Sequence, residues 1–260
     1  MFAKLLKYDF RATWGLIGGL SIIALGAGAL GSVLARMINR DPKDFYLALL
    51  IFAMIAVVVY LVGYSLASMF ILFGRFYKSR FTDEGYMTFT LPVTTHQVLL
   101  SSFLNCLLGI IVSILVTILA FGIMVFFGTV DLDGERWEFV KYCADHLFPA
   151  LGKLGVGNIL SFLMMILATL ASEIIFIMFS ITIGSVIAKK HKILVGVVSY
   201  YALHIATGIA STGLMLSLGV VWTENEFLCF AWTTIAWSAA ISLVFYFAMH
   251  YLTNRKLNLN

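Results

Sequence analysis

The sequence predicts an all-α membrane protein with six transmembrane helices. Its 260 residues are 62% hydrophobic and only 12% charged, whereas about a quarter of the residues of a soluble domain are charged. Six apolar runs are long enough for a helix that crosses a bilayer core, which needs about 20 residues. These runs lack the alternation of apolar and polar residues that is typical of a membrane β-barrel, so helices are expected. The expected spans are 14–35, 45–73, 98–127, 159–188, 193–221 and 227–252.

The distribution of basic residues predicts that both termini are cytoplasmic. Of the 17 Lys and Arg residues, 11 fall on the side of the N-terminus and 6 on the opposite side, and cytoplasmic loops carry the excess of positive charge. The net charge of +4 is explained by this membrane bias, so no nucleic-acid partner is expected.

The first 13 residues are expected to form an amphipathic helix on the inner membrane surface, before a six-span domain over 14–260. Apolar and basic side chains separate onto opposite faces of a helix here. The alternative is a positively charged flank of the first span. The apolar face holds Phe2, Leu5, Leu6 and Phe10, and the basic face holds Lys4, Lys7 and Arg11.

The longest polar connection, 128–158, is expected outside the cytoplasm. Apolar residues at three- and four-residue spacing predict a helix against the outer leaflet, and Pro149 is expected to end or bend it. Cys143 and Cys229 both fall on this side, where a disulfide and two free thiols are alternatives. The apolar residues are Trp137, Val140, Ala144, Leu147 and Leu151.

A charged segment, 74–97, connects the second and third spans on the cytoplasmic side. After three basic residues the chain turns at Thr82, an N-cap candidate, and Thr94 with Gln97 has the spacing of a capping box for the next helix. A short helix with aromatic side chains in this segment suits docking to a soluble partner. The alternative is a connector that packs on its own spans.

Residues 83–93 read D-E-G-Y-M-T-F-T-L-P-V, which resembles the D-E-G-Y-x-T-x-T-L-P-V segment of bacterial ABC-2-type transporter permeases. Such permeases have six spans, cytoplasmic ends, an N-terminal interfacial helix and a cytoplasmic coupling helix between spans two and three. The resemblance implies that this helix enters a cleft of a separate ATP-binding subunit. The contact set implied is Phe81, Asp83, Glu84, Gly85, Tyr86, Leu91 and Pro92.

The same resemblance implies a bacterial cytoplasmic membrane and a second permease, either identical or paralogous, across the substrate path. It is nearest to small permeases of antimicrobial-peptide export and immunity systems of low-GC Gram-positive bacteria. The sequence has no GxxxxGK[ST] phosphate loop, so no cofactor is expected in this chain, and ATP and Mg would be bound by the partner.

A second basic connection lies between the fourth and fifth spans. It would either anchor the chain to anionic lipid or form a second contact with the ATPase. Its residues are Lys189, Lys190, His191 and Lys192.

Three polar residues within the expected spans are candidates for a substrate path or gate. Glu173 and His204 are at similar depths when counted along helices from the connection between them, so they can pair and line a substrate path or gate. A structural hydrogen bond, for example to Thr169 or Ser172, is the alternative. Asn105 in the third span has the same two interpretations.

The leading hypothesis is a non-enzymatic permease subunit that exports an amphipathic or hydrophobic substrate, such as an antimicrobial peptide, a lipid or a drug. An ion-coupled secondary carrier is an alternative, although such carriers have more charge within the membrane. A scaffold subunit without an ATPase is another. An intramembrane metalloprotease would need a motif such as HExxH, which the sequence lacks, so no catalytic or metal-binding residue is expected.

Overall fold

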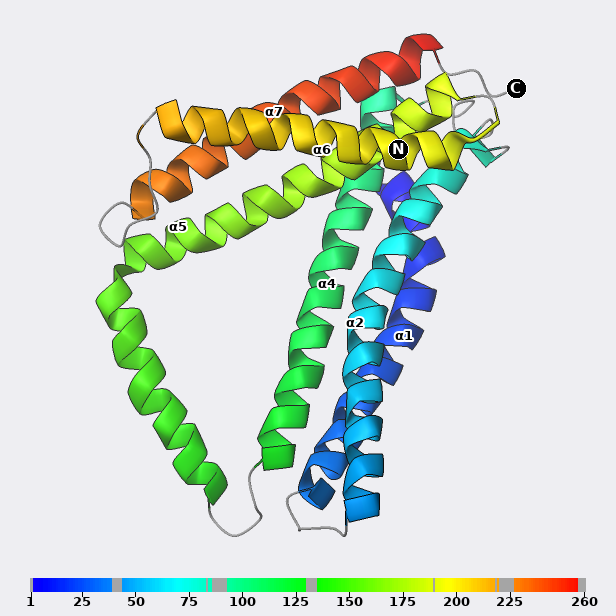
Figure 1. Ribbon diagram of the computed structural model, residues 1–260. Coiled ribbons are helices and arrows are strands. Elements are labelled where there is room, and N and C mark those ends of the chain that lie inside the picture. Colours follow the sequence, from blue (N-terminus) through cyan, green and yellow to red (C-terminus); the bar gives the residue numbers. More distant parts are fainter. Residues whose placement is uncertain are drawn as a thin grey trace. The chain divides into compact units, whose positions relative to one another are not determined.

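The computed structural model describes residues 2–38, 44–82, 84–85, 93–129, 135–188, 190–217, 219 and 227–256. In these residues the regular structure is entirely helical, and six helices are long and apolar enough to cross a membrane. The prediction of an all-α fold with six spans is confirmed. The helices are α1 (Phe2–Ile38), α2 (Asp44–Phe81), α4 (Thr95–Thr129), α5 (Glu135–Ile187), α6 (Lys192–Ser217) and α7 (Phe227–Lys256) (Figure 1).

Helix α1 has no break at the expected boundary between the interfacial segment and the first span. The Thr13 hydroxyl donates to the carbonyl oxygens of Asp9 and Phe10, at 3.2 and 3.3 Å, within the continuous helix. No glycine or proline precedes Gly15, so nothing in this stretch favours a helix end. The location of residues 1–13 on a membrane surface stays a prediction.

Two further helix ends differ from those expected. Helix α2 continues through Gly74 to Phe81, and its basic last turn, with Lys78 and Arg80, suits the negative end of the helix dipole. In α5 the helix passes through Pro149 and breaks at Gly155, where φ is 75°. Of the two alternatives for Pro149, an end of the outer helix is therefore wrong, and a bend at this residue stays a prediction. The break falls at Gly155 because only glycine adopts this left-handed conformation without strain.

The chain forms two compact units. The first contains Met1–Leu6, Phe73–Leu107 and Leu151–Asn260, and the second contains Lys7–Leu72 and Leu108–Ala150. In the second unit, α1, α2 and α4 pack around a buried cluster of Ala24, Leu61, Tyr64 and Ala120.

Small and hydroxyl side chains bring the helices of the second unit together. The Ser21 hydroxyl lies 2.7 Å from the Tyr64 hydroxyl, which joins α1 to α2. A Cβ added at Gly28 would lie 2.5 Å from the carbonyl oxygen of Ala120. The backbones of α1 and α4 approach this closely because Gly28 has no side chain.

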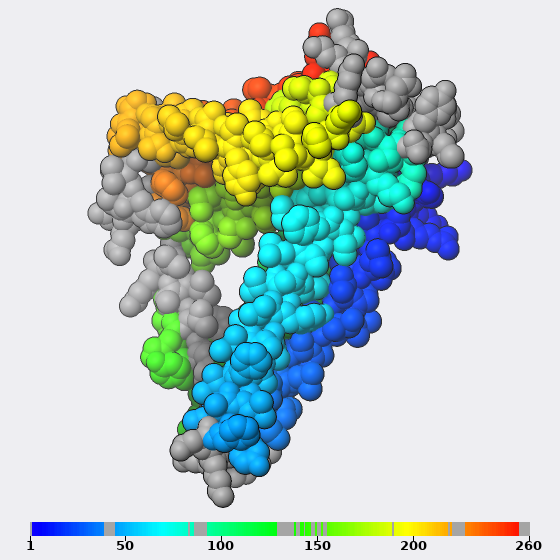
Figure 2. Space-filling model, turned by 45° about the vertical axis from the view of Figure 1, so that its right-hand side comes forward, coloured from blue at the N-terminus to red at the C-terminus, as the bar shows by residue number. Residues whose placement is uncertain are grey.

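In the first unit, α5, α6 and α7 meet through aromatic rings. Phe176 of α5 contacts Tyr200 of α6, with ring centroids 5.7 Å apart, and Phe245 of α7, at 4.9 Å. Near the turn that joins α5 to α6, a Cβ at Gly184 would lie 2.8 Å from the Cα of Gly196. Gly196 is the buried residue of α6, and one face of this helix is exposed at the surface (Figure 2).

Candidate functional site

A buried arginine links segment 74–97, called the coupling segment here after its predicted role, to α4. Arg80, in the last turn of α2, is only 2% exposed. Its guanidinium donates to the Ser102 hydroxyl of α4 from Nε, at 3.2 Å, and from Nη2, at 3.0 Å. Buried charges need such hydrogen bonds to offset the loss of water. Arg80 is one of the three basic residues before Thr82, and its buried role could not be predicted from the sequence because arginine is ordinarily exposed.

A tight turn follows Arg80. The backbone N–H of Gly85 donates to the Thr82 carbonyl, at 2.7 Å. A Cβ at Gly85 would lie 2.4 Å from the Arg80 carbonyl oxygen, so only glycine fits this turn without displacing the backbone. The Thr82 hydroxyl donates back to the Lys78 carbonyl. The Thr82 hydroxyl thus contacts the last turn of α2, and its role as the N-cap of the following turn stays a prediction.

The Glu84 carboxylate folds back onto the last turns of α2. It lies 2.8 Å from Arg75 Nη1 and 3.1 Å from Lys78 Nζ, and 40% of the side chain is exposed. A hydrogen bond from Lys78 holds the pKa of Glu84 below its ordinary value of 4.5; partial desolvation opposes this, and the charge of Arg75 supports it. Glu84 is therefore ionised at neutral pH and orders the start of the coupling segment.

The far end of the segment is held by the first turn of α4. Thr94 N–H donates to Gln97 Oε1, and Gln97 N–H donates to the Thr94 hydroxyl, each at 3.4 Å. This reciprocal pair confirms the expected capping box. The first turn of α4 therefore forms the last part of segment 74–97.

A cluster that the sequence did not reveal connects this turn to α7. The His96 ring stacks on the His250 ring with centroids 3.7 Å apart, and His96 Nδ1 lies 3.1 Å from the Tyr246 hydroxyl. Asn254 Nδ2 lies 3.0 Å from His250 Nε2, and the Thr95 hydroxyl donates to Asn254 Oδ1. The two histidines are more than 150 positions apart in the chain, so no local spacing could have predicted the contact.

The expected ATPase-contact residues have different environments. Phe81 is 5% exposed and packs edge-on against Phe76, with centroids 5.6 Å apart, so in this structure it supports the segment from inside. Glu84 and Gly85 form the turn described above. The remaining members of the set, Asp83, Tyr86, Leu91 and Pro92, lie outside the described residues.

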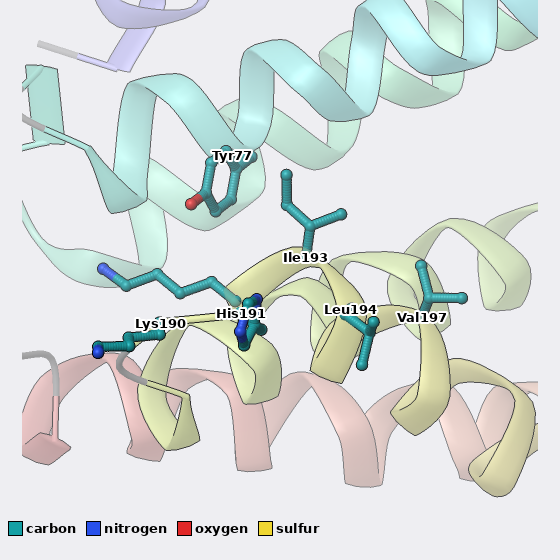
Figure 3. Close-up of a pocket in the computed structure, with 7 residues that line it drawn as sticks. Tyr77, Lys190, His191, Ile193, Leu194 and Val197 are labelled. Atoms are coloured by element: carbon teal, nitrogen blue, oxygen red, sulfur yellow. The ribbon is translucent and has the colours of Figure 1, made fainter.

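The second expected cytoplasmic contact lies beside the end of α2. Lys190 and His191 are exposed and Lys192 is half-buried, and Lys189 lies outside the described residues. These side chains border a groove whose other wall contains Tyr77 of α2 (Figure 3). The structure thus brings the α5–α6 turn and the base of the coupling segment to one surface.

Glu173 of α5 and His204 of α6 meet inside the membrane-spanning region. Glu173 Oε1 lies 3.2 Å from His204 Nε2, and both side chains are 46% exposed. The Thr169 and Ser172 hydroxyls donate to backbone carbonyls of their own helix, whereas His204 and Tyr200 of α6 both contact Glu173. Asn105 is 3% exposed on α4 and does not face an open surface. A role for these three residues in a substrate path or gate stays a prediction.

Comparison with known proteins gives one match. Residues 35–135 match the family of ABC-2 family transporter proteins. This region contains α2, the coupling segment and α4. No curated protein and no solved structure matches the chain. The match, together with six helices suited to crossing a membrane, supports a multi-pass membrane protein that is the permease of an ABC transporter. Over residues 35–135, the resemblance to ABC-2-type transporter permeases that the sequence predicts is confirmed.

Proposed function

We propose that this chain is the permease subunit of a bacterial ATP-driven exporter, and that a separate ATP-binding subunit docks on the coupling segment 74–97. Both termini and this segment face the cytoplasm in the proposed orientation. ATP and Mg are bound by the partner, and a second permease, identical or paralogous, completes the path. The substrate is amphipathic or hydrophobic (an antimicrobial peptide, a lipid or a drug), in keeping with the predominantly apolar spans.

The observation that carries the proposal is the double attachment of this segment to two spans. Arg80 ties its beginning to Ser102 of α4, while the turn at Gly85 packs against the Arg80 carbonyl. A protein that pushes on the segment would therefore displace α2 and α4 together. Rigid anchoring of this kind is needed for ATP-driven movement of a soluble subunit to reach membrane helices.

The histidine cluster extends this linkage to a third helix. Because the His96 ring stacks on the His250 ring, a movement of the first turn of α4 would also displace the cytoplasmic end of α7. In this proposal one docking event reorients α2, α4 and α7, which gives alternating access to the substrate path.

The first test is affinity purification of the chain from its native membrane, with mass spectrometry of the proteins that elute with it. An ATP-binding subunit is expected at roughly one copy per permease. Glu84→Arg, which places a third cation beside Arg75 and Lys78, and Tyr86→Ala are expected to abolish coupled ATPase activity while membrane insertion is retained. Glu138→Gln, which alters an exposed carboxylate of α5, is the matched control. Normal stimulated turnover in both segment variants would refute docking at this segment.

Arg75→Gln separates direct contact from internal support. It removes one of the ion pairs of Glu84 but leaves the carboxylate in place. If Glu84 acts by touching the ATPase, Glu84→Gln lowers coupled activity more than Arg75→Gln does. Equal losses would assign Glu84 to the internal order of the segment.

A second candidate function, a proton-coupled carrier, is favoured by the Glu173–His204 pair, because ionisable groups within a membrane are typical of proton pathways. Transport by the purified chain in vesicles, driven by a pH gradient without ATP or a partner, would support it. Loss of this transport in Glu173→Gln would assign it to the pair. ATP-dependent transport that persists after the pH gradient is collapsed supports the exporter.

A further inference from the structure

An open groove of 760 Å³ lies between the end of α2 and the start of α6. Tyr77 forms part of one wall, and Lys190 and Ile193 lie on the opposite side (Figure 3). Lys192 also lines the groove. All of these residues belong to the first compact unit. The groove is therefore defined within a single part of the molecule.

One end of the groove is cationic. Lys190 and Lys192 border it together with His191, and within the described part of the chain no carboxylate lies within ion-pair distance of either lysine. The first turn of α6 also lacks acidic residues, so its unpaired N–H groups add positive potential. This end of the groove suits an anionic oxygen ligand.

The other end of the groove is apolar and uncovered. Ile193, Leu194 and Val197 are 70%, 63% and 50% exposed, and they lie at the beginning of a helix that is apolar enough to cross a membrane. Figure 3 shows Ile193 and Tyr77 facing each other across the groove. Within one helical turn the surface changes from cationic to apolar, as the surface of a bilayer does.

This arrangement matches a ligand that carries a phosphate next to a hydrocarbon chain. Free phosphate would use only the lysines and make no contact with the apolar wall. Because α6 is long and apolar enough to cross a membrane, its first apolar side chains suit contact with acyl chains better than contact with a soluble protein segment. A phospholipid satisfies both ends of the groove at once.

We propose that this groove binds an anionic phospholipid, with the headgroup phosphate held by Lys190 and Lys192 beside the Tyr77 phenol and an acyl chain lying along Ile193 and Leu194. The site rests on the membrane location of α6 and does not depend on an ATPase partner. Because Tyr77 belongs to the base of the coupling segment, a bound lipid also fixes the position of the α5–α6 turn against the end of α2.

The test is thermal stabilisation of the full chain in detergent by short-chain lipids. Dihexanoyl phosphatidylglycerol is titrated in parallel with dihexanoyl phosphatidylcholine and with inorganic phosphate. We expect the anionic lipid to raise the melting temperature at concentrations at which the other two have little effect. Removal of both charges in Lys190→Gln/Lys192→Gln is expected to weaken the apparent affinity about 25-fold, from the contribution per lysine near an anionic lipid surface.

Three variants make the result specific to the groove. Lys190→Arg/Lys192→Arg keeps the charge and is expected to retain binding. Leu194→Ser keeps both lysines and is expected to weaken lipid binding without changing the response to phosphate. Lys141→Gln removes a positive charge from an exposed position of α5 that does not line the groove and is expected to leave the preference for the anionic lipid unchanged.

Several outcomes would overturn the proposal. Equal stabilisation by phosphate and phosphatidylglycerol would make the groove a site for a free anion. Unchanged lipid affinity in Lys190→Gln/Lys192→Gln, with loss of a co-purifying ATPase, would make the turn a protein contact. The lipid proposal and the exporter proposal are tested separately. Lipid binding by a chain that has no ATPase partner would support the lipid site even if the exporter proposal fails.

Discussion

Substitution of Gly85 by alanine is the sharpest probe of the coupling segment. The added Cβ would lie 2.4 Å from the carbonyl oxygen and 2.7 Å from the carbonyl carbon of Arg80, whereas ordinary contact begins at 3.4 Å. These atoms are backbone and cannot rotate away, so the turn has to open by about 1 Å. Such overpacking costs about 1–3 kcal/mol, which lowers the population of the closed turn about 5- to 150-fold.

The matched control is Gly74→Ala in α2, the helix that precedes this turn. A Cβ there meets nothing within 4 Å, and alanine is the better helix former by about 1 kcal/mol, so no loss of stability is expected. Both variants are melted in detergent with a thiol-reactive dye, in a Cys143→Ser/Cys229→Ser background that leaves the buried Cys106 as the reporter. Gly85→Ala is expected to melt about 2 to 10 °C below the control.

Two results would refute this reasoning. Equal melting temperatures for the alanine variants of Gly74 and Gly85 would contradict the close approach of the turn to the Arg80 carbonyl. A lower melting temperature with undiminished partner-stimulated ATPase activity would keep the packing argument and reject the role of the turn in coupling.

Three further predictions concern charges and helix packing. Because the folded-state pKa of Glu84 is lowered from 4.5, its ion pairs stabilise the chain above that pH and are lost as pH falls through the folded pKa; the melting difference between wild type and Glu84→Gln should shrink on acidification, and a constant difference would contradict the ion pairs. In a double-mutant cycle with Glu173→Gln and His204→Gln, we expect a coupling energy of about 0.5–2 kcal/mol from thermal melts, whereas strictly additive effects would exclude the pair. Gly28→Ala is expected to lower the melting temperature while Gly26→Ala does not, since only the first added Cβ meets another helix; equal effects would argue against the close packing of α1 on α4.

Much of the fold could be predicted because hydropathy is a property of contiguous residues. A run of about 20 apolar residues has few alternatives to a membrane helix, so the number of spans did not depend on tertiary contacts. Helix ends were harder to predict. Helix α2 continues past Gly74 because the basic turn that follows suits the helix C-terminus. Helix α5 passes through Pro149 and breaks at Gly155.

The capping box at the start of α4 could also be predicted from the local sequence. The Thr94–Gln97 spacing was enough, because both residues belong to one helical turn. The likeness of residues 83–93 to a coupling segment was readable for the same reason, since the motif is contiguous.

Only the tertiary structure decided which polar groups meet across helices. The burial of Arg80 against Ser102, the stacking of His96 on His250 and the position of Tyr77 beside the α5–α6 turn depend on how each helix is rotated about its axis. One residue along a helix changes direction by about 100°, so spacing within a segment cannot say which distant segment a side chain faces. The sequence alone thus determined that this protein has six helices long and apolar enough to cross a membrane and which contiguous segment resembles the coupling segment of ABC-2-type permeases, whereas helix packing decided what holds that segment in place.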